Sequence, residues 1–217
     1  MYLFIDTETT GKVDFKRPAS DWCQPDILEL SAALFDADKR LVQCFSTLVR
    51  CPHAGGWRIE PEAGAVHGIT NEMCEQYGML RFRCLGILNE MAIRARLVIA
   101  HNLKFDLAVI NTAALRAATD PLVDYFDLDP NLTEGPFYCT MGRATDICRI
   151  PFPNGGNDYK WPKLEEAYEF FTGCELGVAH RGLYDVLACA DIFFELRKDE
   201  REAAYIDDLL NVSRETS

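Results

Sequence analysis

The first eleven residues, MYLFIDTETTG, constrain the fold more than any other segment of the chain. The apolar run at Tyr2–Asp6 predicts a short buried strand, which leads directly into a second acid at Glu8. Side chains two residues apart on an extended chain point to the same face, about 6.5 to 7 Å apart along it. Two such carboxylates repel each other unless something compensates them, so the pattern favours a bound cation at the end of this strand.

The chain has 217 residues, of which 48% are hydrophobic, and this is enough for one domain with a substantial core. We expect one domain at 1–198 and an acidic, helical tail at 199–217. Because no apolar run approaches the roughly 18 residues of a membrane span, we expect a cytoplasmic protein. Its nine scattered cysteines include no CxxC pair, which favours reduced thiols over disulfides or zinc.

The net charge of -12 argues against a large basic surface that holds nucleic acid through counterion release alone. Part of this charge is explained if carboxylates gather around divalent ions. Any polyanionic ligand is then held by metal ions and local contacts.

Strand patterns come first and then alternate with helix patterns, which predicts a mixed sheet flanked by helices. After the first strand, a polar loop at 12–25 (KVDFKRPASDWCQP) precedes two further strands, Ile27–Phe35 and Leu41–Arg50. Later segments predict helices at 79–96, 163–171 and 182–197 and another that follows Asn102, strands at 97–100 and 137–140, and a turn-rich connector at 151–162 (PFPNGGNDYKWP).

Further acids and histidines lie where predicted strands end or helices begin. Asp106 and Asp185 fall in first turns, where the helix dipole favours any acid, so each alone is as well explained by helix stability. His67 and His101 could each be ordinary turn residues that satisfy backbone groups, and Asn102 is placed to cap the helix that follows it.

Together, four motifs in this order (DTETTG, HGIT, HNLKFD and AHRGLYD) resemble the DnaQ-like exonucleases of the DEDDh type, within the ribonuclease-H-like superfamily. The histidine five residues before the last aspartate is typical of this branch. KLEEAYEFFTG, before the last motif, is also similar to family members from phage, prophage and bacteria. The resemblance spans Asp6 to Asp185 and implies an α/β fold with a mixed, largely five-stranded sheet flanked by helices, with Asp6 at the end of its central strand.

The resemblance implies a two-metal phosphodiester hydrolase. Asp6, Glu8 and Asp185 would bind one Mg²⁺ or Mn²⁺, and Asp6 and Asp106 a second one. Two such ions stabilise the attacking and leaving oxygens of an in-line displacement. His180 would be the general base, and the products would be nucleoside 5′-monophosphates released from the 3′ end of a single strand.

Substrate contacts are also implied by similarity. They involve the terminal nucleotide and the pocket around Asp106, through Thr9, Thr10, Gly11, His67, His101 and Asn102. Relatives often carry an apolar residue after the glycine, where this chain has Lys12. The exposed-loop aromatics Phe15, Trp22, Tyr159 and Trp161 either stack on bases of a single strand or fix their loops to the body.

Single-stranded DNA is the expected substrate, and a polymerase or replication protein is a candidate partner. An exoribonuclease or oligonucleotide-trimming enzyme uses the same catalytic residues and differs in contacts to the 2′-hydroxyl. A non-catalytic module that binds a nucleic-acid end or a polymerase is the alternative from another class. Such a module is expected to have lost a metal ligand or the base, and this chain keeps all five residues.

Overall fold

The computed structural model describes residues 1–52, 55–119, 127–155, 158–177 and 181–215. Of these, residues 212–215 are described by their backbone alone. A five-stranded sheet with the order β3-β2-β1-β4-β5 forms its centre. The central strand β1 (Tyr2–Thr9) is antiparallel to β2 (Ile27–Phe35), which is antiparallel to β3 (Leu41–Leu48). On its other side β1 is parallel to β4 (Leu97–Ala100), and β4 to β5 (Phe137–Cys139).

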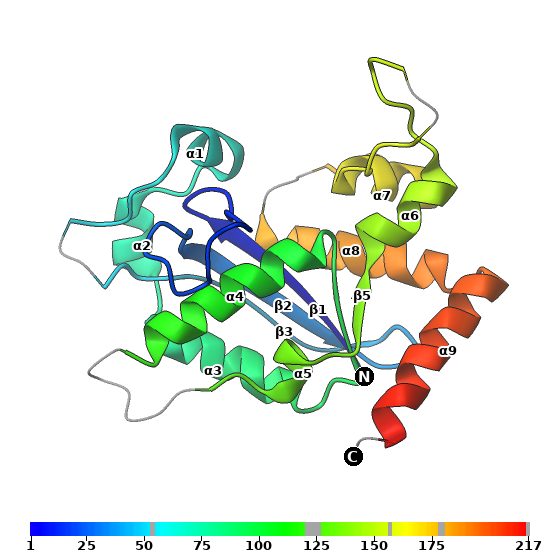
Figure 1. Cartoon of the computed structure of the whole chain (residues 1–217), viewed down its shortest axis with the longest axis horizontal. Helices are drawn as coiled ribbons and strands as arrows, with labels where there is room; N and C mark the ends of the chain where they lie inside the picture. The colour runs from blue at the N-terminus through cyan, green and yellow to red at the C-terminus, as the bar shows by residue number, and fades with distance from the viewer. Residues whose placement is uncertain (53–54, 120–126, 156–157, 178–180, 216–217) are drawn as a thin grey trace.

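Helices cover both faces of the sheet, which confirms the predicted α/β fold (Figure 1). In chain order the helices are α1 (Pro61–His67), α2 (Asn71–Tyr77), α3 (Arg81–Ala92), α4 (Leu103–Ala117), α5 (Pro130–Thr133), α6 (Thr140–Cys148), α7 (Leu164–Thr172), α8 (Gly182–Leu196) and α9 (Glu200–Glu215). None of these described helices combines the length and the apolar character that crossing a bilayer requires.

Two hydrophobic cores, one on each face of the sheet, follow from the alternation of side chains along β1. Leu3 and Ile5 pack on the face covered by α3 and α4. Tyr2 and Phe4 pack on the opposite face, against aromatic residues of α8 such as Phe193. The even-numbered positions of β1 therefore point toward α8, and Asp6 and Glu8 continue that series.

β1 is longer than its apolar segment indicates. It continues to Thr9, because Asp6, Thr7 and Glu8 keep their pairing with β2. The prediction that Asp6 lies at the strand end is therefore wrong by three residues. The register shifts between Glu8 and Thr9, at the point where the chain leaves the sheet.

Candidate metal and active site

Three carboxylates meet beside the carboxyl end of β1. Asp6 and Glu8 come from the strand, and Asp185 comes from the first turn of α8. One potential ligand atom from each lies within 4.8 Å of the others. The structure thus brings together three of the four predicted metal ligands from opposite ends of the chain.

Asp106, the fourth predicted ligand, reaches this region from the other face of the sheet. It is buried in the first turn of α4, and the hydroxyl of Thr7 donates a hydrogen bond of 2.9 Å to its Oδ1. Thr7 lies between Asp6 and Glu8 on β1, so this bond joins Asp106 to the strand that carries the other acids.

The electrostatics of the site is dominated by burial and by repulsion among acids. Burial and then the neighbouring Asp185, Glu29 and Asp106 raise the pKa of Glu8 to about 8. Burial raises the pKa of Asp106 to about 7, although its bond to Thr7 acts in the opposite direction. The pKa of Asp6 is held well above its ordinary value by burial and by the surrounding carboxylates. Without a cation, this group of acids favours protonation.

These residues fit a divalent cation. Oδ2 of Asp6 is buried without a hydrogen-bond partner, which is costly for a polar atom unless a ligand meets it. All the neighbours that raise the pKa of Asp6 are carboxyl groups. A compact set of carboxylate oxygens suits Mg²⁺ or Mn²⁺.

A close approach between α8 and the sheet positions Asp185. A Cβ atom on Gly182 would lie 2.2 Å from Oγ of Ser31 on β2, so a glycine lets the start of α8 approach the strand. Glu29, opposite Glu8 on β2, also lies beside the cluster and accepts a hydrogen bond from Ser46. Sequence reasoning missed Glu29, because its place beside Glu8 depends on strand register.

The predicted substrate residues after Glu8 already have partners within the protein. The Thr9 hydroxyl donates to the carbonyl of Gly11 at 2.7 Å, and the Thr10 hydroxyl accepts a bond from the Asp26 amide at 2.9 Å. Nε2 of His67 lies 3.2 Å from the carbonyl of Thr9. This last contact brings His67, at the end of α1, to the end of β1.

His101 and Asn102 have structural roles that differ from a simple cap. His101 contacts the Thr140 hydroxyl and the Pro162 carbonyl, both at 3.0 Å, and burial lowers the pKa of its imidazole. Asn102 adopts a left-handed conformation with φ of 79°, and its side chain makes no cap hydrogen bond. The predicted capping role of Asn102 is therefore wrong, because an N-cap side chain normally acts from an extended backbone.

A cleft of about 660 Å³ opens over the carboxylates. Its walls include α1, the start of α4 and the start of α7, and it could admit a nucleotide-sized ligand. The residues that line it are Asp6, Thr7, Glu8, Lys12, Val66, His101, Asn102, Phe105, Lys163, Leu164, Glu165 and Asp185. Predicted base His180 lies outside the described residues.

The sheet order and the carboxylates at its central strand define an α/β protein of the ribonuclease-H-like class. The chain belongs to the exonuclease family: the family model RNase_T, described as Exonuclease, matches residues 3–193. This match confirms the family predicted from the four motifs.

Solved structures of Escherichia coli Exonuclease I share the fold. The complex with a dA16 oligonucleotide has a TM-score of 0.67 at 16% identity, and covers 95% of this chain and 43% of that one. The complex with a dT13 oligonucleotide has a TM-score of 0.69 at 18% identity, and covers 95% of this chain and 42% of that one. A zinc-bound complex with single-stranded DNA gives 0.68 at 19%, again with 95% and 42% covered. The chain thus spans less than half of these relatives, and no curated protein sequence matches it.

Proposed function

We propose that the protein is a metal-dependent 3′–5′ exonuclease that removes nucleoside 5′-monophosphates from single-stranded DNA. The observation that carries the proposal is the meeting of Asp6, Glu8 and Asp185 within 4.8 Å, in a member of the exonuclease family. Exonuclease I, which shares the fold, has been solved with single-stranded oligonucleotides, and this supports the choice of substrate.

The family resemblance implies the roles of the acids, and the meeting of Asp6, Glu8 and Asp185 beside β1 supports them. Asp6, Glu8 and Asp185 would hold one Mg²⁺ or Mn²⁺, and Asp106 would help to hold a second with Asp6. When bound, the ions would stabilise negative charge on the phosphodiester during displacement. Thr7 fixes the orientation of Asp106 through its hydrogen bond. His180, two residues before α8, would accept the proton of the attacking water.

The proposal also covers the setting of the enzyme. We place the catalytic unit at 1–198, with 199–217 as an appended segment whose α9 packs on the domain through Ile206 and Leu210. A cytoplasmic location suits a protein with nine free cysteines. A polymerase or replication protein is the candidate partner of an enzyme that trims 3′ ends.

The decisive experiment is digestion of matched single-stranded DNA and RNA oligomers, labelled at the 5′ end, with Mg²⁺, Mn²⁺ or EDTA. We expect a ladder that shortens from the 3′ end of DNA, requires the ion, and is absent with Asp185→Ala. His180→Ala should slow the reaction by about 10² to 10⁴-fold, as expected for loss of a general base.

Shortening from the 5′ end would contradict the polarity, and faster digestion of RNA would favour the exoribonuclease. A folded protein that digests neither oligomer with either ion would contradict the catalytic proposal.

A further inference from the structure

A second groove, of about 450 Å³, lies next to the catalytic cleft. Lys12 lines both cavities, and Thr10 and Gly11, which also line the groove, directly continue the strand that carries Asp6 and Glu8. The opposite wall comes from the segment at 58–61, which leads into α1. A nucleic-acid strand that extends from the carboxylate site past Lys12 would therefore enter this groove.

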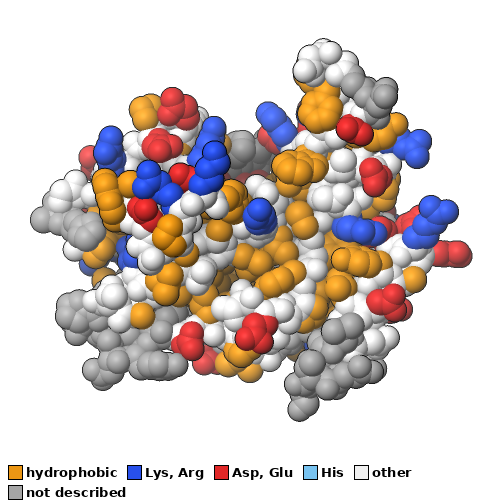
Figure 2. All heavy atoms as spheres, viewed as in Figure 1, with side chains coloured by type: hydrophobic (Ala, Val, Ile, Leu, Met, Phe, Trp, Pro, Cys, Tyr) orange, Lys and Arg blue, Asp and Glu red, His pale blue; other side chains and the backbone are white. Residues whose placement is uncertain are grey.

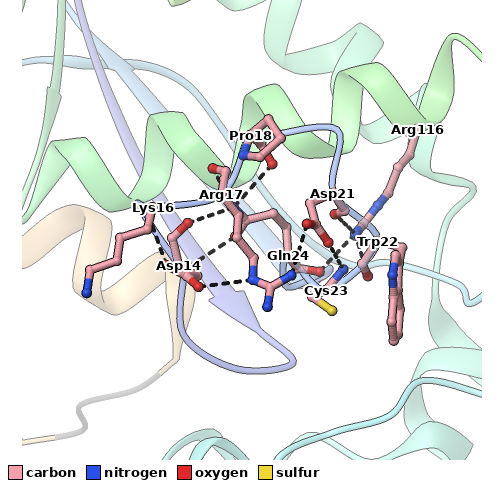
Figure 3. A network of polar contacts seen from close by, with 9 residues as sticks. All are labelled: Asp14, Lys16, Arg17, Pro18, Asp21, Trp22, Cys23, Gln24 and Arg116. Atoms are coloured by element: carbon pink, nitrogen blue, oxygen red, sulfur yellow. Dashed lines mark hydrogen bonds and ion pairs between the residues drawn. The ribbon is translucent and has the colours of Figure 1, made fainter.

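The outer wall of the groove is the loop at 12–25, which is held in shape by buried Gln24 (Figure 3). The side-chain amide of Gln24 donates to the carbonyls of Asp14, Arg17 and Pro18, and its oxygen accepts the amide of Asp14. Arg17 adds ion pairs with Asp14 and Asp21, both at 3.1 Å. The loop is thus organised by its own side chains before any ligand binds.

Arg116 of α4 anchors the far end of the same loop. Its guanidinium donates to the backbone carbonyls of Asp21, Trp22, Gln24 and Pro25. These bonds hold the backbone on both sides of Trp22, while the indole ring points away from the network (Figure 3).

Trp22 is the most exposed large apolar side chain of the described residues, with 82% of its surface accessible. Trp57, in contrast, is 5% exposed and packs in the core. An aromatic ring that fixes its loop to the body would be covered by that body, so this role does not explain Trp22. Because the backbone around Trp22 is already fixed, stacking of a ligand ring on the exposed indole would cost little conformational entropy.

The charges of the groove suit a phosphodiester chain. Lys12 and Arg58 line it with exposed side chains. The carboxylate of Asp26 is compensated by Arg81 at 3.1 Å and Arg116 at 2.7 Å. Figure 2 shows Lys and Arg side chains over this region of α1 and the loop, although the whole chain is acidic. Glu60, the other acid that lines the groove, lies against Gly11.

We propose that this groove binds the nucleotides upstream of the scissile end, with Trp22 stacking on a base and Lys12 and Arg58 binding backbone phosphates. The proposal rests on the exonuclease function above and names the path of its substrate. Stacking supplies grip without sequence preference, which suits an enzyme that must move along any single strand. Glu60 would keep phosphates away from Gly11 and toward the two cations.

Binding without turnover tests the groove independently of catalysis. The affinity of labelled dT13 and rU13 is measured by fluorescence anisotropy for the Asp185→Asn protein, alone and combined with Trp22→Ala, Trp22→Phe or Tyr77→Ala. We expect Trp22→Ala to weaken binding by about 10-fold, as for loss of one base–aromatic stack. Trp22→Phe should keep most of the affinity, and Tyr77→Ala, an exposed aromatic outside the groove, should keep all of it.

Salt dependence tests Arg58, one of the two cations. Arg58→Ala should reduce the slope of log affinity against log salt by about 0.7, the value for one phosphate contact on a single strand. Lys198→Ala, which removes an exposed lysine on the surface after α8, should leave the slope unchanged.

Turnover separates the groove from the catalytic site. The p-nitrophenyl ester of thymidine 5′-monophosphate has no upstream nucleotide, so Trp22→Ala should hydrolyse it like the unchanged protein while its KM for dT13 rises about 10-fold. The groove proposal would be overturned if Trp22→Ala left the affinity for dT13 and the affinity for rU13 unchanged. A protein that binds through Trp22 but cleaves neither substrate would support the groove and contradict the exonuclease function.

Discussion

Two groups of carboxylates, the buried Glu202 and the partly buried pair Asp6 and Glu8, have their charge compensated in opposite ways. Glu202 of α9 accepts a hydrogen bond of 2.8 Å from the Tyr138 hydroxyl and one of 2.9 Å from Nε of Arg143, with which it forms an ion pair. Asp6 and Glu8 have mainly other carboxylates as charged neighbours. The first group is compensated by the protein itself, and the second requires a cation from outside.

The difference separates a structural site from a functional one. A buried acid with its own arginine and tyrosine fixes α9 to the domain and leaves nothing to bind. A buried acid with other acids around it is unfavourable in the empty protein, and such a cost persists where it serves a ligand. The raised pKa values at the carboxylate cluster therefore support its assignment as a site for a ligand.

Replacing an acid by its amide should have opposite consequences in the two groups, and the largest effect is on turnover. Asp6→Asn should lower activity by more than about 100-fold. Removing a residue that only supports a metal ligand costs up to about that much, and Asp6 is itself a proposed ligand. In metal-free buffer the same variant should be at least as stable as the unchanged protein, because it removes repulsion. Digestion of single-stranded DNA and thermal unfolding in EDTA test both parts, and normal turnover would contradict the metal site.

Adding a divalent ion should stabilise only the protein with the intact cluster. At an ion concentration of 100 Kd, Mg²⁺ or Mn²⁺ should raise the free energy of unfolding by about 2.7 kcal/mol. Asp6→Asn should lose most of this increase, since it removes a ligand. Urea unfolding with and without the ion measures the effect. An equal increase in both proteins would show that the ion binds elsewhere.

Glu202→Gln should lower the free energy of unfolding by about 1 to 3 kcal/mol, because it leaves Arg143 and Tyr138 without their acceptor charge. Arg143 is partly exposed, so water offsets part of the loss. Urea unfolding gives the change, and turnover below the unfolding transition should be unaffected. Unchanged stability would show that α9 is held by its apolar contacts alone.

The pH dependence of the metal-free protein tests the raised pKa values. Folded Glu8 keeps its proton up to a pKa of about 8, and Asp106 up to about 7, whereas the unfolded chain releases these protons near 4.5 and 3.8. The free energy of unfolding in EDTA should therefore fall as pH rises from about 4 to 8. Saturating Mg²⁺ should reduce this fall, because deprotonated carboxylates bind the ion better. A rise over this range in EDTA would contradict the raised pKa values.

Sequence patterns predicted the central elements well for a physical reason. The strands at Ile27–Phe35 and Leu97–Ala100 are buried almost throughout, so their apolar runs have the bounds of the structural elements. The short helix α1 begins at Pro61 and has no buried residue, so no apolar periodicity reveals it. Tertiary contacts, not local pattern, determine such helices.

The sequence motifs predicted the acids of the candidate site but not the residues that surround and position them. Four acids follow from motifs, whereas the nearness of Glu29 depends on strand register, and that of Gly182 to Ser31 on helix packing. The sequence predicts only a polar, irregular loop around Trp22. The loop is ordered by Gln24 and by Arg116, which is distant in sequence, so no local pattern indicates that order.

The candidate metal ligands come from β1, α4 and α8, so long stretches of chain separate Asp6 from Asp106 and Asp106 from Asp185. No shorter stretch contains the complete set. A chain that emerges from the ribosome thus holds Asp6 and Glu8 early and lacks Asp185 until α8 has been made. The candidate metal site is therefore complete only once α8 has been synthesised.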